Sequence, residues 1–178
     1  MKLRLATPAD ADRLLAWRND PATRANSRHQ DLVTPEAHAA WLSQTLADPA
    51  RDLFVAESDD GAVLGTGRLD WTGSEVEVSL TLDAGARACA LATPLILALC
   101  DQARLRGATR IWADVQAENV VSWRAFHGAW FVAQTIRMER TVEGSASNAG
   151  SAADRPGVDE SRNAAPASGA SASKGGNA

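Results

Sequence analysis

The sequence predicts an α/β fold with a mixed (α+β) sheet, in the order β-α-α-β-β-β-α-β-α-β. Three observations support this fold class. Apolar residues make up 45% of the 178 residues and charged residues 22%, as is typical of soluble globular domains. Three strand patterns follow one another at hairpin spacing, and helical patterns with start or stop signals flank them on both sides.

The chain begins with a predicted strand and helix. Residues 2–6 alternate polar and apolar side chains, as a half-buried strand does. Thr7-Pro8-Ala9-Asp10 then gives a capping pattern with proline at the first helical position. We expect this helix to run to about Ala16, with an exit before Pro21.

A second helix is predicted over residues 35–46. Thr34-Pro35-Glu36 repeats the start signal of the first helix. Helical spacing would place four side chains on one side: His38, Trp41, Leu42 and Thr45.

Three antiparallel strands are predicted next, over residues 52–58, 62–70 and 75–82. Turn sequences at Asp59-Asp60-Gly61 and Thr72-Gly73 separate them at hairpin spacing. The last strand alternates strictly, so one of its faces should be core and the other polar. Its apolar face carries Val76, Val78, Leu80 and Leu82, and its polar face carries Glu75, Glu77, Ser79 and Thr81.

A core-facing helix is predicted within residues 90–106, where Leu91, Leu95 and Leu99 recur at helical spacing. Proline is tolerated only in a first helical turn, so Pro94 places the start between residues 90 and 93. The backbone N–H groups of about residues 88–93 should then lack intrahelical partners.

The carboxy-terminal part is predicted as a strand over 110–115, a helix capped by Asn119 that ends near Gly128, and a strand over 130–140. Residues 143–178 are mostly Ala, Ser, Gly and Asn, which cannot bury enough apolar surface to fold. We therefore expect one domain over residues 1–142 and a disordered tail over 143–178.

Composition excludes several classes of function. The net charge of −4 argues against nucleic acid as the main partner, and no apolar run is long enough to span a membrane or to form a secretory signal. A cytoplasmic protein is expected. Cys89 and Cys100 read as core thiols, and the spacing of the histidines predicts no metal site. The sequence has no tyrosine, which excludes a phenol as proton donor.

Residues 82–92, Leu-Asp-Ala-Gly-Ala-Arg-Ala-Cys-Ala-Leu-Ala, resemble the acyl-CoA pyrophosphate loop of the GCN5-related N-acetyltransferase (GNAT) superfamily, and the element order over about residues 2–141 resembles its fold. The resemblance implies acetyl-CoA as co-substrate. Free N–H groups at a helix start suit a diphosphate. The residues implied around it are Arg87, Ala88, Ala90, Leu91 and Ala92. Alanine stands where glycine is usual, so we expect weaker or altered binding, although a helical backbone at residue 90 would not need glycine.

Residues 113–126 are similar to a second motif of the superfamily, a carboxylate at the end of a strand followed by an Asn-capped helix. The resemblance implies that Asn119 and Ser122 support the cofactor and that the backbone of Val78, Ser79 and Leu80 polarises the thioester. Asp114 is implied as the first choice of base and Glu77 as the second. Ser122 would donate to the leaving sulfur, since Phe126 stands where many members carry tyrosine.

A third pattern consists of Trp17-Arg18-Asn19, Arg24 and Thr34-x-Glu36-x-His38-x-x-Trp41-Leu42. It resembles the ribosomal-protein N-terminal acetyltransferases and the related acetyltransferases of UDP-linked amino sugars. The resemblance implies an acceptor wall that contains Arg18, Asn19, Arg24, His38 and Trp41. We expect acetyl transfer to a primary amine of a small molecule, first a nucleotide-linked amino sugar. Two alternatives stay open: acetylation of protein N-termini, and a degenerate binding module without catalysis. The protein is expected to be a monomer or a homodimer.

Overall fold

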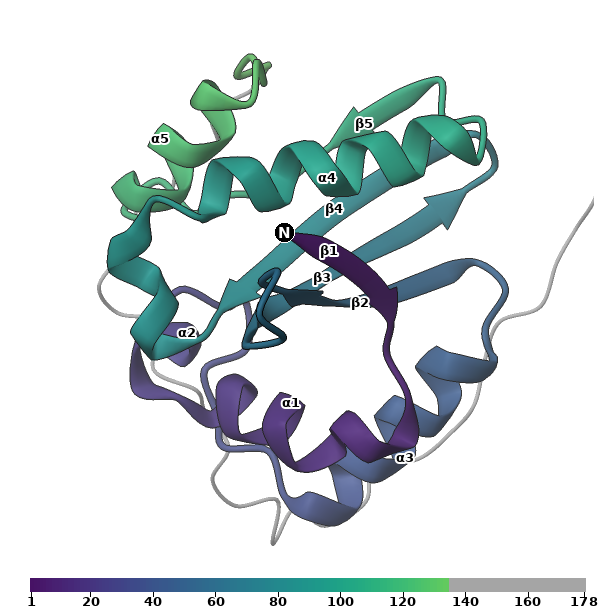
Figure 1. The fold of residues 1–178 in the computed structure, drawn as a ribbon, viewed down its shortest axis with the longest axis vertical. Helices are drawn as coiled ribbons and strands as arrows, with labels where there is room; N and C mark the ends of the chain where they lie inside the picture. Colours follow the sequence, from purple (N-terminus) through teal and green to yellow (C-terminus); the bar gives the residue numbers. More distant parts are fainter. Residues whose placement is uncertain (135–178) are drawn as a thin grey trace, which may run out of the picture. The chain divides into compact units, whose positions relative to one another are not determined.

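A computed structural model describes residues 1–134, except for the side chain of Ala88, and one five-stranded sheet organises this part of the chain (Figure 1). The strand order is β1-β2-β3-β4-β5. The first four strands pair antiparallel, and β5 pairs parallel with β4. The bounds are β1 Lys2–Leu5, β2 Arg51–Glu57, β3 Val63–Thr72, β4 Glu75–Leu82 and β5 Arg110–Trp112. The expected mixed sheet is thereby confirmed.

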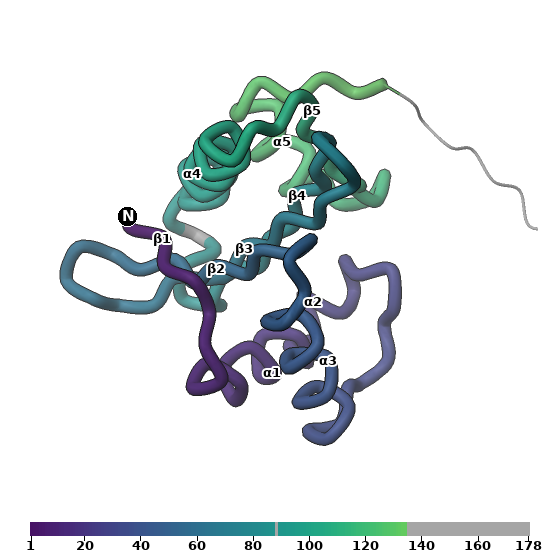
Figure 2. Tube along the Cα trace, turned by 90° about the vertical axis from the view of Figure 1, so that its right-hand side faces the viewer, coloured from purple at the N-terminus to yellow at the C-terminus, as the bar shows by residue number. Residues whose placement is uncertain are grey.

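Helices cover both faces of this sheet, with α1 and α3 on one side and α4 on the other (Figure 2). Side chains cap three of them: Asp20 accepts from the backbone of Thr23, Thr34 from Ala37 and Asn119 from Ser122. The sequence predicts helix starts at Thr34 and Asn119. The helical bounds are η1 Pro8–Asp10, α1 Ala11–Asn19, α2 Pro21–Ala25, α3 Pro35–Ala47, η2 Ala84–Cys89, α4 Ala92–Leu105 and α5 Val120–Gly128.

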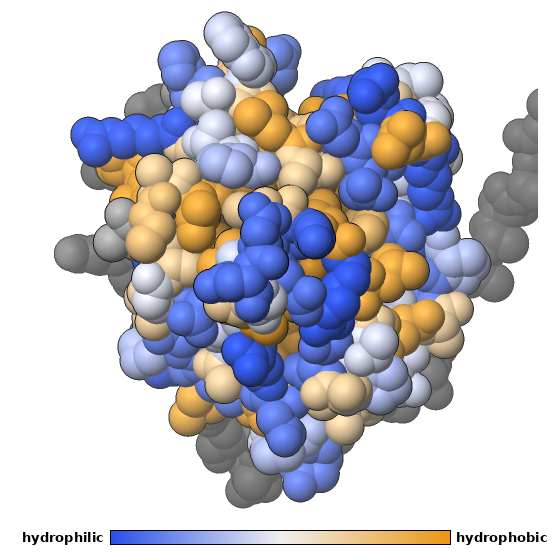
Figure 3. Space-filling model, in the orientation of Figure 1, coloured by the Kyte–Doolittle hydropathy of each residue, from blue (hydrophilic) through white to orange (hydrophobic). Residues whose placement is uncertain are grey.

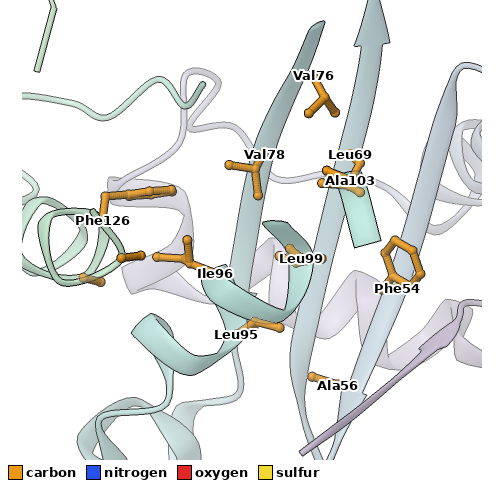
Figure 4. Close-up of a cluster of buried hydrophobic side chains, with 12 residues drawn as sticks. Phe54, Ala56, Leu69, Val76, Val78, Leu95, Ile96, Leu99, Ala103 and Phe126 are labelled. Atoms are coloured by element: carbon orange, nitrogen blue, oxygen red, sulfur yellow. The ribbon is translucent and has the colours of Figure 1, made fainter. Parts of the chain in front are cut away.

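The strand β2 is buried on both faces and joins two hydrophobic clusters. Phe54 and Ala56 pack with side chains of α4 and α5, whereas Leu53 and Val55 pack with α1 and α3. Figure 4 shows the larger cluster, in which the side chains of α4 point at those of β3 and β4. Its buried members are Phe54, Ala56, Leu69, Val76, Val78, Leu95, Ile96, Leu99, Ala103, Ala125, Phe126 and Ala129.

An ion pair fixes the junction between β1 and the first helical turn. Arg4 donates to both carboxylate oxygens of Asp10 at 2.9 and 2.7 Å, and to Glu57 at 2.7 Å. The Asp10 carboxylate also accepts from the backbone N–H of Thr7 at 2.8 Å. Asp10 is only 8% exposed, and its hydrogen bonds from Arg4 hold its pKa well below the usual range.

The surface that faces the viewer in the orientation of Figure 1 carries hydrophilic and apolar residues. The hydrophilic residues gather over the middle, and apolar residues lie beside them (Figure 3). Several large apolar side chains are exposed, among them Leu105, Val121 and Trp130. Within the described residues, no helix is both long and apolar enough to cross a bilayer.

The observed elements depart from the sequence prediction in three places. The first helix extends to Asn19 and is followed by α2, which the sequence analysis did not predict. The strand predicted over 110–115 ends at Trp112. Residues 130–134 form no strand, because Trp130 takes a positive φ of 67° and the Phe131 N–H returns to the Phe126 carbonyl at 3.0 Å. The rest of the strand predicted over 130–140 and the tail predicted over 143–178 lie outside the described residues.

Candidate active site

The strands β4 and β5 separate after the pair Glu77 and Trp112, and β4 continues alone on that side to Leu82. The Leu82 carbonyl points away from β3, because it accepts from Arg87 while the N–H of the next residue, Asp83, donates to Leu64 on β3. Backbone directions alternate along a strand, so the N–H groups of Val78 and Leu80 also point into this gap. The sequence analysis named the backbone of Val78, Ser79 and Leu80, and the same alternation turns the N–H of Ser79 towards β3.

Two carboxylates meet beside this gap. Glu77 lies on the face of β4 that is turned towards α1 and α3, and its side chain is 20% exposed. Asp114 follows β5, and its side chain is 65% exposed. Both accept hydrogen bonds from the same nitrogen, Nη2 of Arg28, at 2.9 and 2.6 Å respectively. The structure therefore brings the two candidate bases together.

Sequence reasoning missed Arg28. It lies outside every motif, in the segment after α2, and only the loop conformation carries it to the carboxylates. A further contact ties the same segment to the chain after β5, since Gln116 Nε2 donates to the Ser27 carbonyl at 3.0 Å. The one signal in the sequence is the accumulation of arginines over residues 18–28.

Three residues expected at the acceptor wall hold the backbone of this same segment. Arg18 donates to the His29 carbonyl at 2.8 Å, and Arg24 donates to the Gln30 carbonyl at 3.0 Å. Asn19 makes two bonds to Val33, one to its carbonyl at 2.8 Å and one from its N–H at 2.9 Å. In this structure, the three side chains shape the wall by positioning a loop.

The other two residues expected at the wall lie on α3. His38 is only 3% exposed and packs against Trp41, with ring centroids 5.2 Å apart. Burial lowers the pKa of His38, which favours the neutral ring. This burial argues against the expected contact of His38 with an acceptor, whereas Trp41 is half-buried.

Arg87, the expected cation of the pyrophosphate loop, is joined to α2. Its Nη2 donates to Asp20 at 2.7 Å and to the Thr23 hydroxyl at 3.1 Å, and its Nε donates to the Leu82 carbonyl. The hydrogen bond from Arg87 lowers the pKa of Asp20. The guanidinium is therefore fixed between the end of β4 and the start of α2, with its charge partly balanced.

The turn before α4 is held by Asp83, which caps η2. Its carboxylate accepts from the Gly85 N–H at 2.9 Å and from the Trp17 indole at 2.8 Å. The hydrogen bond from Trp17 is the main reason that the pKa of Asp83 is lowered. One side chain thus ties α1 to the start of η2.

Ala90 corrects one expectation about this turn. The sequence analysis placed a helical backbone at residue 90, where alanine would cost nothing, but α4 begins at Ala92. Ala90 instead has φ 54° and ψ 27°, the left-handed conformation in which Cβ is unfavourable and glycine is preferred. Alanine therefore strains the turn at a position where the superfamily usually carries glycine.

The start of α4 presents backbone donors beside this turn. Leu91 is the first residue before the helix, and its carbonyl accepts from the Leu95 N–H at 3.0 Å. The N–H groups of Ala92 and Thr93 precede that first helical bond and have no intrahelical acceptor. These two N–H groups are the donors that the start of α4 could offer to an anion.

The second motif has the predicted local structure. The Asn119 carboxamide oxygen accepts from the Ser122 N–H at 3.1 Å and caps α5, and the Ser122 side chain is half-buried. Phe126 lies in the core and meets Phe131 edge to face, with centroids 5.0 Å apart. Phe126 is thus a packing residue here.

Metal-ligating side chains do not gather at this site. Among the described residues, no three of the His, Cys, Asp and Glu side chains lie close enough together to hold a metal ion. Cys89 and Cys100 are free thiols, and burial raises the pKa of Cys100 to about 11. What the gap offers chemically is two carboxylates, backbone donors and a helix start.

Comparisons with known proteins identify a family model and solved structures that resemble this chain. A family model described as acetyltransferase (GNAT) domain matches residues 1–129. A ribosomal-protein-alanine N-acetyltransferase from Brucella melitensis is 27% identical, with a TM-score of 0.60 over 71% of this chain and 82% of that one. No curated protein matches the sequence.

Two solved structures bound to coenzyme A share the fold at lower identity. The spermidine N-acetyltransferase from Vibrio cholerae, in complex with CoA and spermine, is 16% identical, with a TM-score of 0.71 over 75% of this chain and 82% of that one. The aminoglycoside acetyltransferase AAC(6')-Ib, in complex with coenzyme A, is 21% identical, with a TM-score of 0.66 over 75% of this chain and 84% of that one.

Proposed function

The chain belongs to the GNAT acetyltransferase family, and from this premise we propose that it transfers the acetyl group of acetyl-CoA to a primary amine of a small molecule, first a nucleotide-linked amino sugar. The observation that carries the proposal is the gap after Glu77, where β4 has no partner strand on the side of β5 and lies beside two carboxylates. Solved structures of the same fold hold coenzyme A, which supports acetyl-CoA as the co-substrate.

The proposed cofactor site extends along β4 to the start of α4. The N–H groups of Val78 and Leu80, on either side of Ser79, would polarise the thioester carbonyl. The diphosphate would lie at the turn formed by Arg87, Ala88, Ala90, Leu91 and Ala92, where the start of α4 supplies donors and the positive end of its dipole. Asn119 would support the cofactor arm through the helix that it caps.

The proposed reaction is direct attack of the amine on the thioester. The amine nitrogen forms a bond to the carbonyl carbon, the C–S bond breaks, and its electron pair stays on sulfur. A carboxylate takes the proton of the amine, directly or through water. Glu77 and Asp114 are both proposed for this step. Ser122 would donate a hydrogen bond to the departing thiolate.

One observation favours a second candidate function, acetylation of protein N-termini. The identity to the ribosomal-protein-alanine N-acetyltransferase is higher than to the other two structures described above. The degenerate binding module also stays open, because alanine occupies the left-handed position 90 and the sequence has no tyrosine.

The test is an acetyl-transfer assay with the full chain, acetyl-CoA and three classes of acceptor: amino sugars with and without a nucleotide, polyamines, and peptides with free N-termini. We expect release of free thiol with an amino sugar. Glu77→Gln or Asp114→Asn should lower kcat by about 10²- to 10⁴-fold, whichever residue is the base. Glu75→Gln is the matched control, since Glu75 is on the same face of β4 but pairs with Arg110.

Binding of acetyl-CoA is measured separately by thermal unfolding. Acetyl-CoA at 100 times its dissociation constant should stabilise the protein by about 2.7 kcal/mol. Turnover of peptides alone would favour the second function. Stabilisation without turnover of any amine would favour the binding module, and the absence of both would contradict the proposal.

A further inference from the structure

Arg28 uses only part of its guanidinium to hold the two carboxylates. Both bonds come from Nη2, which donates to Glu77 and to Asp114. Among the described residues, Nε and Nη1 of Arg28 have no hydrogen-bond partner, and the side chain is 61% exposed. The planar group is therefore oriented from one side while two of its nitrogens stay open to a ligand.

The segment that carries Arg28 has an excess of positive charge. Residues 18–30 contain three arginines and a single acid, Asp20, which is paired with Arg87. Arg18 and Arg24 donate only to backbone carbonyls, so no carboxylate neutralises them among the described residues. The charges of Arg18 and Arg24 would favour an anion beside this segment, whereas the charge of Arg28 is offset by Glu77 and Asp114.

We propose that Arg28 is a specificity-determining residue that binds an oxyanion of the acceptor, a phosphate or a carboxylate close to the reacting amine. The inference rests on the proposed function and names its substrate class more narrowly. The open Nε and Nη1 lie on different edges of the guanidinium, so each can donate a single charge-assisted hydrogen bond to an oxyanion. The carboxylates of Glu77 and Asp114 would face the amine of the same molecule.

The net charge of the site suits an acceptor that carries both a protonated amine and an oxyanion. Arg28 together with Glu77 and Asp114 leaves one net negative charge for a protonated amine. A polycation would gain less electrostatic binding energy here than at two unpaired carboxylates, and the arginines of residues 18–30 would repel it. The arrangement therefore selects an acceptor with both charges over a polyamine.

The test measures acetyl transfer by the full chain to three acceptors: glucosamine 1-phosphate, glucosamine, which lacks the phosphate, and spermidine. We expect wild-type kcat/KM to be at least about tenfold higher for the phosphate than for glucosamine. Arg28→Gln should bring the ratio of kcat/KM for the two acceptors to within about threefold of one, with the loss for the phosphate mainly in KM, whatever the variant does to both acceptors through Glu77 and Asp114. Arg28→Lys should keep only part of the preference, because a single ammonium group cannot hold two carboxylates and an oxyanion in the fixed directions of a planar guanidinium.

Arg110→Gln is the matched control, because Arg110 is also 61% exposed and pairs with a glutamate of β4. It should leave the preference unchanged. Calorimetric titration of glucosamine 1-phosphate into the protein tests Arg28 without turnover. Binding to wild type that is lost in Arg28→Gln supports the proposal, even if no acetyl transfer occurs and the proposed function fails.

Three results would overturn the inference. The first is equal binding of the phosphate by wild type and Arg28→Gln. The second is a gain in spermidine turnover in Arg28→Gln with no loss for the phosphate, which would make Arg28 a block against cations. The third is no binding of the phosphate to wild type at all.

Discussion

The two faces of β3 and β4 differ sharply, although the same two strands build both. On the face towards α4, Leu69, Val76 and Val78 are at most 2% exposed and pack on α4. On the opposite face, β3 and β4 carry Arg68 and Glu77, both in ion pairs. Side chains alternate along a strand, so one face can hold the fold together while the other stays polar for chemistry.

The largest expected effect would break the apolar face. Leu99→Ala should reduce the free energy of unfolding by about 3 to 5 kcal/mol, because Leu99 is fully buried and leaves a cavity. Urea denaturation measures the change. Leu97→Ala on the same helix is the control, since Leu97 is 40% exposed and should cost below about 1 kcal/mol. Equal losses for the two variants would contradict the comparison.

The apolar face could be predicted from the sequence, because it follows from local periodicity. Strict alternation over residues 75–82 and the stripe of Leu95 and Leu99 each specify a buried side without knowledge of the rest of the chain. The capped starts of α3 and α5 follow from Thr34 and Asn119 in the same way.

The polar face could be predicted only in part. Glu77 and Asp114 were identified through the resemblance, but their shared partner Arg28 depends on how a loop folds back over the sheet. The left-handed conformation of Ala90 was missed for a different reason. Alanine is a good helix former, and local propensity gives no warning of a strained turn.

A smaller effect is expected at a polar contact that is structural. Asp10→Asn should destabilise the protein by about 1 to 2 kcal/mol at pH 7, since it removes the carboxylate that accepts two hydrogen bonds from Arg4 and leaves Arg4 with Glu57 as its charged partner. The pKa of Asp10 is lowered in the folded state, so its contribution is complete above about pH 4 and is lost as the pH falls further.

Thermal unfolding of wild type and Asp10→Asn over a range of pH checks this prediction. The two proteins should differ most near neutrality and should converge in acid, if both stay folded there. A difference in stability that grows as the pH falls would show that the predicted direction of the pH dependence is wrong.

The smallest expected effect concerns the turn at Ala90. Ala90→Gly should raise the free energy of unfolding by about 0.5 to 1 kcal/mol, because glycine takes the left-handed conformation without strain. Ala92→Gly is the control, and it should destabilise the first turn of α4. A loss of stability in Ala90→Gly would mean that residue 90 does not hold this conformation.

The central claim is that acetyl-CoA binds in the gap between β4 and β5. Its most direct test is an acetyl-CoA titration of the full chain, followed through the backbone amide resonances of β4 and the start of α4. The account predicts that the largest shift changes fall on Val78, Leu80 and Ala92, with little change along β1. Saturable changes confined to other parts of the chain, or none at millimolar acetyl-CoA, would contradict it.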